Sequence, residues 1–161
     1  MSIAPAASFY DVIVAVHIMA VVIAFGVTFA YPIIFTVGAR AGVRSLPLLH
    51  RVEYTIERWL INPGLLAVLV AGIYLASDRH LWSEFFVQWG LAATIVIGAL
   101  VGAVMIPTAK RAEQVATRDG AAGEGASPSD EYRALARRLT LVGGALSLLV
   151  LVTILFMVVK P

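Results

Sequence analysis

Four long stretches of the chain carry no charged side chain, and this pattern limits the fold more than any other feature. At about 1.5 Å of rise per residue, each stretch reaches roughly 28 to 42 Å as a helix, enough to cross a hydrocarbon core about 30 Å thick. The stretches are apolar on every side, whereas the strands of a membrane barrel alternate between apolar and polar residues. The sequence therefore predicts an all-α membrane protein, a four-transmembrane-helix bundle that forms one domain over residues 1–161. The uncharged stretches are residues 12–39, 59–77, 85–109 and 139–159.

The residues that flank these stretches set the expected helix boundaries. A segment rich in Gly, Ala and Ser cannot bury apolar surface, so we expect a mobile cytoplasmic loop at about 115–128. Ser127, with Pro128 at the first helical position and Asp130 three residues after the serine, predicts a capping box before the last helix. The four helices are expected at about 10–39, 57–77, 84–109 and 133–159.

The basic residues predict the orientation of the bundle. Of the twelve Lys and Arg residues, only Arg79 and Lys160 lie outside the connections between the first and second and between the third and fourth stretches. The positive-inside rule then places both long connections in the cytoplasm and both termini outside. Because the basic residues lie beside membrane spans, we expect no nucleic-acid partner. The start of the chain, Met1–Tyr10, has no Lys or Arg, unlike a removable signal peptide.

The connection from Arg40 to Arg58 interleaves leucines and valines with charged residues and His50. Such a pattern is typical of an amphipathic segment at the membrane surface. We therefore expect this connection to lead into the second helix along the cytoplasmic interface, with His50 at that interface.

Small residues recur every four positions in the third stretch, at Gly90, Thr94, Gly98 and Gly102. A ridge of this kind allows close approach of a neighbouring helix in lipid. Packing inside the bundle is the simpler interpretation, and a homodimer through Gly98 and Gly102 is the other. Pro32 is expected to kink the first helix.

His17 is the one ionisable side chain, apart from tyrosines, inside any uncharged stretch, and such a residue is a candidate functional site. Its imidazole could be an axial ligand to haem iron, a hydrogen-bonding group that contacts Thr94 or Thr153, or part of a proton or ion relay. His80, in the short outer loop, is expected on the same side of the membrane. It is either a solvated loop residue or a sixth ligand to the same iron.

Several classes of site have no support in the composition. The chain has no cysteine, which excludes disulfides, thiolate metal sites and covalent haem attachment. The methionines lie at different depths and do not form the soft cluster that copper prefers. No hydrolase or NTPase motif is present. Because no charged residue is expected to line the interior of a helix, a small transporter is also disfavoured.

Three segments resemble an uncharacterised bacterial family of integral membrane proteins, a domain of unknown function. That family is similar to the copper-resistance protein D and HemJ-type protoporphyrinogen oxidase group of four-helix membrane proteins. The resemblance implies a bacterial cytoplasmic (inner) membrane protein in which His17 holds haem b. The three segments are Val16-His17-Ile18-Met19-Ala20 through Phe25-Gly26, Asn62-Pro63-Gly64 through Ala71-Gly72, and Ile154 to Pro161.

Two functional hypotheses follow. In the first, the protein binds b-type haem through His17 and serves electron transfer or porphyrin-related redox chemistry with a membrane redox partner. In the second, it is a non-catalytic membrane scaffold or accessory subunit in which His17 has a structural role.

Overall fold

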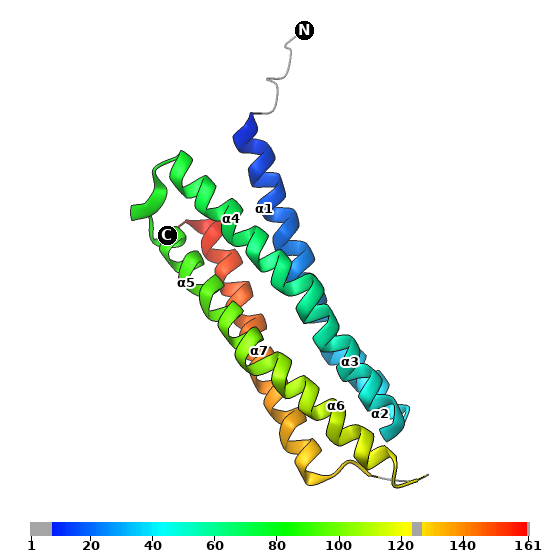
Figure 1. Ribbon diagram of the computed structural model, residues 1–161. Helices are drawn as coiled ribbons and strands as arrows, with labels where there is room; N and C mark the ends of the chain where they lie inside the picture. Colours follow the sequence, from blue (N-terminus) through cyan, green and yellow to red (C-terminus); the bar gives the residue numbers. More distant parts are fainter. Residues whose placement is uncertain (1–7, 124–126, 161) are drawn as a thin grey trace.

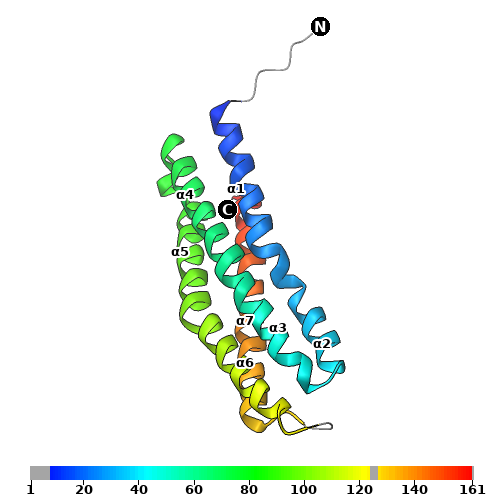
Figure 2. The same cartoon turned by 45° about the vertical axis from the view of Figure 1, so that its right-hand side comes forward.

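The computed structural model describes residues 8–123 and 127–160, and within these ranges every regular element is a helix. The start of α1 and the end of α7 lie toward one end of the elongated bundle, and the α2–α3 and α6–α7 connections lie at the other (Figures 1 and 2). We call the second end the arginine-rich end, after Arg40, Arg44, Arg118 and Arg133. The predicted all-α bundle of four spans is confirmed. The four segments long and apolar enough to cross a membrane are Phe9–Arg40, Val43–Asp78, Phe85–Gly120 and Asp130–Val159.

The first segment is two helices joined by a tighter turn. Helix α1 (Phe9–Phe25) passes through the 3-10 turn η1 (Gly26–Phe29) into α2 (Tyr31–Arg40). Pro32 lies in the first turn of α2, where its missing N–H group would have no helical partner in any case. The expected single helix over 10–39 is therefore interrupted next to the predicted kink.

The second segment begins well before the predicted boundary at residue 57. It runs through a 3-10 turn, η2 (Val43–Ser45), α3 (Leu46–Ile56), a π turn, η3 (Glu57–Ile61), and α4 (Asn62–Asp78). A proline in a helix removes one N–H group and crowds the carbonyl four residues earlier. Pro63 accordingly follows a widened π turn, and the helix continues instead of ending.

The third segment repeats this construction after a 3-10 turn, η4 (Leu81–Ser83). Helix α5 (Phe85–Leu100) widens into a second π turn, η5 (Val101–Met105), just before α6 (Ile106–Gly120). Helix α6 includes residues 115–120, the first part of the predicted mobile loop. Val115 and Ala116 are buried in the core, in a helix that packs along α3, which explains this extension. Residues 124–126 of that loop lie outside the described residues.

The last segment is one uninterrupted helix, α7 (Asp130–Val159). Its N-cap is Ser129, whose hydroxyl accepts a hydrogen bond from the Tyr132 amide, so the cap lies two residues after the predicted Ser127. The Asp119 carboxylate accepts the Ser129 N–H at 2.8 Å. This bond from the end of α6 positions Ser129 to begin α7.

Close packing of the helices depends on glycines. A Cβ atom on Gly64 of α4 would lie 2.7 Å from the Ala24 Cβ of α1, so the two helices can approach only because Gly64 has no side chain. A Cβ on Gly98 would lie 2.9 Å from the Leu65 side chain, whereas Gly102 has open space around it. At Gly98 the row of small residues therefore packs against another helix of the same bundle, as the simpler interpretation expects. The homodimer stays a prediction.

The bundle is apolar outside and carries polar side chains inside. Large hydrophobic residues such as Leu66, Leu151 and Val158 are more than half exposed, as expected for a surface in contact with lipid. Buried polar or charged side chains are the informative exception in any fold. Among the described residues they are His50, Glu53, Glu57 and Thr108.

Candidate functional site: an acidic cavity inside the bundle

A stripe of polar residues faces the interior of the bundle from α3 and the π turn η3. His50, Glu53 and Glu57 are three and four residues apart, which places them on one helix face. They are 1%, 4% and 1% exposed, while Leu48 and Val52 on another face are 64% and 43% exposed. His50 therefore faces the interior of the bundle, and its expected depth at the membrane interface stays a prediction. In lipid the apolar face of an amphipathic helix turns outward, and here the polar face turns into the bundle.

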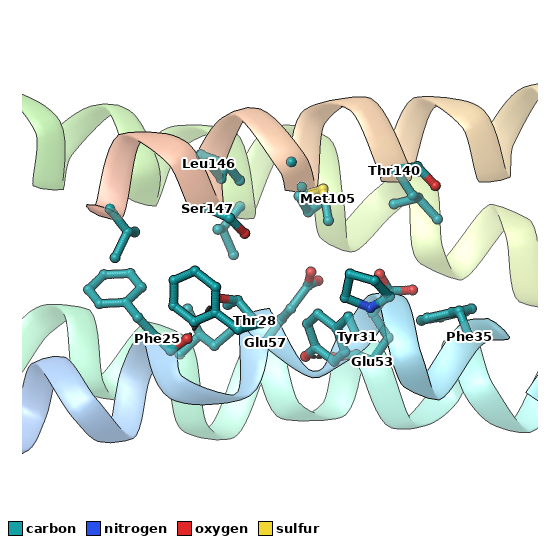
Figure 3. A pocket seen from close by; sticks show the side chains of 18 of the residues that line it. Phe25, Thr28, Tyr31, Phe35, Glu53, Glu57, Met105, Thr140, Leu146 and Ser147 are labelled. Carbon is teal, nitrogen blue, oxygen red and sulfur yellow. Dashed lines mark hydrogen bonds between the residues drawn. The ribbon is translucent and has the colours of Figure 1, made fainter. Parts of the chain in front are cut away.

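These residues line a cavity of about 350 Å³. It lies between the first half of the bundle, α1 to α4, and the second half, formed by α5, α6 and α7 (Figure 3). Most of the lining is apolar, and aromatic rings are prominent in it. The rings belong to Phe25, Phe29, Tyr31 and Phe35.

His50 joins two sides of this cavity by hydrogen bonds. Its Nδ1 atom lies 2.9 Å from Oε2 of Glu53, one turn away in α3, and its Nε2 atom lies 3.0 Å from the hydroxyl of Tyr132 in α7. The tautomer of the ring sets the roles: with Glu53 ionised and the ring neutral, Nδ1–H donates to Glu53 and Nε2 accepts the Tyr132 O–H. The Glu53 carboxylate is thus held by its own helix.

Glu57 is different, because its Oε2 atom is buried and has no hydrogen-bond partner. Figure 3 shows its carboxyl group pointing into the space between the two halves of the bundle. A buried carboxylate without a partner costs several kcal/mol, roughly, in lost solvation. The group therefore requires a compensating positive charge, either a proton or a bound cation.

The described part of the chain does not supply that charge as a basic side chain. The lining of the cavity contains no Lys or Arg. At the arginine-rich end, Arg51 pairs with Glu113 at 2.7 Å, and Arg111 and Arg118 both pair with Glu131, all with largely exposed guanidinium groups. These pairs connect α3 to α6 and α6 to α7.

A second cavity of about 330 Å³ lies beside the first, nearer the arginine-rich end. Phe35 and Ala136 line both cavities. Tyr132 lines the second and His50 lines the first, so the hydrogen bond between them joins the walls of the two. The bond therefore lies between the two cavities.

His17 lies half-buried in the seam between α1 and α4. A Cβ on Gly72 would be 3.3 Å from its Cε1 atom, and its buried Nδ1 atom has no hydrogen-bond partner. The hydroxyl of Thr94 donates to the Gly90 carbonyl. The hydroxyl of Thr153 accepts from the Trp89 indole and donates to Leu149. In the described structure the expected bond from His17 to either threonine is not formed.

The structure does not bring His80 to His17. His80 is exposed, with a left-handed φ of 55°, in the turn after α4. That helix continues six residues past Gly72 to Asp78, about 9 Å along its axis. Over residues 8–123 and 127–160, no group of three or more His, Asp or Glu is arranged to hold a metal ion.

The Nδ1 atom of His17 fits haem ligation, whereas the packing of its ring leaves little room for a haem. The buried Nδ1 atom has no hydrogen-bond partner, which fits a nitrogen that binds a metal. The ring is packed against Gly72, however, and His17 does not line the central cavity, so a macrocycle would have to separate α1 from α4. The haem site stays a prediction.

Sequence reasoning placed His50 at the interface and gave no functional role to Glu53, Glu57 or Tyr132. His50, Glu53 and Glu57 lie before Trp59, where the second uncharged stretch begins, so a search inside uncharged stretches passes over them. Their spacing of three and four residues was the available signal. The sequence around Tyr132 carries no signal of its role, because its partner His50 is 82 positions away.

The fold and the cavity define a polytopic integral membrane protein with buried acidic groups. A family model described as a predicted integral membrane protein (DUF2269) matches residues 11–161, and the chain belongs to that family. The chain matches no curated protein and no solved structure. Membership confirms the expected membrane family of unknown function. The further likeness to the copper-resistance protein D and HemJ-type group stays a prediction.

Proposed function

We propose that the protein binds a cation in the membrane interior in exchange for a proton at Glu57, and that it acts as a small cation carrier. The observation that supports this function is the buried Glu57 carboxyl group, which faces the cavity with one oxygen unpartnered. Intramembrane carboxyl groups that face a cavity are typical of ion and proton pathways.

The exchange follows from charge balance at one group. With a proton, the Glu57 carboxyl is neutral and stable in the apolar cavity. Without it, the carboxylate needs another positive charge at the same place, because an isolated buried charge is costly. A cation and the proton therefore compete. Glu53, which accepts a hydrogen bond from His50, is already partnered.

The sequence argument against a transporter rested on uncharged helix interiors. The structure overturns that premise, since two carboxylates lie inside the bundle in the second segment. The π turn η3 begins at Glu57, and such turns are frequent at functional sites.

Carbodiimide labelling tests the proposal. Dicyclohexylcarbodiimide enters apolar sites and reacts with protonated carboxyl groups, so we expect mass spectrometry to find the adduct on Glu57. Glu57→Gln should remove it. Glu84→Gln is the matched control, because Glu84 is exposed at the other end of the bundle and its loss should leave the Glu57 adduct unchanged. Equal labelling of the wild-type chain and Glu57→Gln would refute the proposal.

Haem b at His17 is the second candidate, supported by the unpartnered Nδ1 atom. A haem held there would supply one-electron chemistry for electron transfer or porphyrin-related redox reactions with a membrane redox partner. Protein purified from a haem-replete host should show a Soret band that shifts on dithionite reduction and is absent in His17→Ala. Featureless spectra in both would reject haem. Lower stability of His17→Ala with no spectral change would favour the scaffold alternative.

We also propose that the arginine-rich end faces the cytoplasm of a bacterial inner membrane, with both termini outside. Ten of the twelve basic residues lie within residues 40–58 and 110–138, the two parts of the chain that contain the connections at this end. The chain has no cysteine, so Ala122→Cys introduces a single thiol at this end, at an exposed position. In whole cells an impermeant maleimide should label it only after the membrane is opened. Labelling of intact cells would show the opposite orientation, with the arginine-rich end outside.

A further inference from the structure

We infer that the cation is an organic monocation with an apolar body, such as a quaternary ammonium or an alkylated amine. This inference rests on the proposed cation exchange at Glu57 and adds the chemical class of the ligand. Three properties of the cavity lead to it: the number of free carboxylates, the groups that surround them, and the available volume.

The charge of the ligand follows from the carboxylates. Glu53 accepts a hydrogen bond from His50, which leaves Glu57 as the acidic side chain without a partner in the described cavity lining. One free carboxylate balances one positive charge. Calcium takes six to eight oxygen ligands, as a rule, and magnesium a near-octahedral shell. The lining offers two carboxyl groups, and the described residues form no group of three or more suited to a metal.

The surroundings of Glu57 favour an apolar cation over a hydrated one. The rings of Phe25, Phe29, Tyr31 and Phe35 line the cavity, and aromatic faces attract cations that have lost their water. The lining is mostly apolar, and an apolar surface does not replace a hydration shell.

The volume of the cavity indicates a suitable size for the ligand. At about 350 Å³ the cavity falls near the lower end of small-molecule sites, which span about 300 to 1,000 Å³. A cation with roughly a dozen non-hydrogen atoms fits such a space. Benzyltrimethylammonium combines one fixed positive charge, an aromatic body and this size, so it is a suitable probe.

The experiment is calorimetric titration of the purified full-length chain in mild detergent with benzyltrimethylammonium. We expect saturable binding that Glu57→Gln weakens by at least about tenfold, because the charge partner is lost. Phe29→Leu should weaken binding by about threefold through loss of a ring face. Thr117→Val is the matched control, because Thr117 does not line the cavity and its hydroxyl bonds to the Glu113 carbonyl of its own helix, so its affinity should equal that of the wild-type chain.

A second measurement needs no variant and covers the case in which Glu57→Gln does not fold. Benzyltrimethylammonium should protect Glu57 of the wild-type chain from the carbodiimide, and potassium at the same concentration should not. If potassium protects Glu57 and benzyltrimethylammonium neither binds nor protects, the ligand class is wrong and the cation exchange stands. If Glu57 does not react and the probe binds Glu57→Gln as tightly as the wild-type chain, both proposals fail.

Discussion

The hydroxyl of Tyr132 in α7 lies 3.0 Å from Nε2 of His50 in α3, and this bond joins the two halves of the bundle beside the acidic cavity. The other nitrogen of His50 is held by Glu53 at 2.9 Å. Three side chains from two helices thus form one buried chain of hydrogen bonds, beside which Glu57 stands alone.

Loss of the Tyr132 hydroxyl should destabilise the protein. Tyr132→Phe keeps the ring but leaves a buried nitrogen of His50 without a partner, which costs about 1 to 3 kcal/mol of unfolding free energy. Tyr74→Phe is the control, because Tyr74 is 37% exposed, and its effect should stay within about 0.5 kcal/mol. Unfolding in detergent by added dodecyl sulfate measures both. Equal stability of the two variants would show that the bond contributes nothing.

The same bond should also restrict access to the central cavity from the arginine-rich end. Because the chain has no cysteine, Ser147→Cys places a single thiol in the cavity lining. Adding Tyr132→Phe should raise the rate at which a small hydrophilic thiol reagent modifies that cysteine in proteoliposomes. Ala122→Cys, exposed outside the cavity, should react at the same rate with or without Tyr132→Phe. An unchanged rate at position 147 would mean that the two cavities are not separated at this bond.

Gly64 should tolerate substitution poorly. In Gly64→Ala the new Cβ would lie 2.7 Å from the Ala24 Cβ, so α1 must move away from α4, at a cost of about 1 to 3 kcal/mol. Gly144→Ala is a matched change in α7 with no neighbouring atom within 4 Å, and it should stabilise its helix by about 0.5 to 1 kcal/mol. Thermal unfolding of the two variants should therefore shift in opposite directions.

The ion pairs at the arginine-rich end should contribute little. Glu131→Gln removes a carboxylate that pairs with Arg111 and Arg118, while Arg118 keeps its pair with Asp119. Both arginine side chains are 59% exposed, so we expect only a small loss of stability. The loss should shrink in high salt, because exposed pairs are screened. A larger loss that does not respond to salt would indicate that this cluster holds α6 and α7 together more firmly than an exposed pair can.

Much of the fold could be predicted because membrane insertion constrains sequence directly. Four uncharged stretches long enough to cross a bilayer can only be helices when they are apolar on all sides. The helices nevertheless extend beyond those stretches, to Val43 and to Gly120, because buried contacts between α3 and α6 stabilise charged segments as helix. Prolines at 63 and 107 leave these helices continuous by widening one turn each.

The sequence by itself determined the class of protein, the number of spans and the end of the bundle that carries most of the arginines, since each depends on composition along the chain. Only the tertiary structure decided which polar residues are inside. The phase of α3 turns His50, Glu53 and Glu57 inward, and the packing of α7 brings Tyr132 to His50. Burial depends on the neighbours of a helix, and those neighbours are distant in sequence.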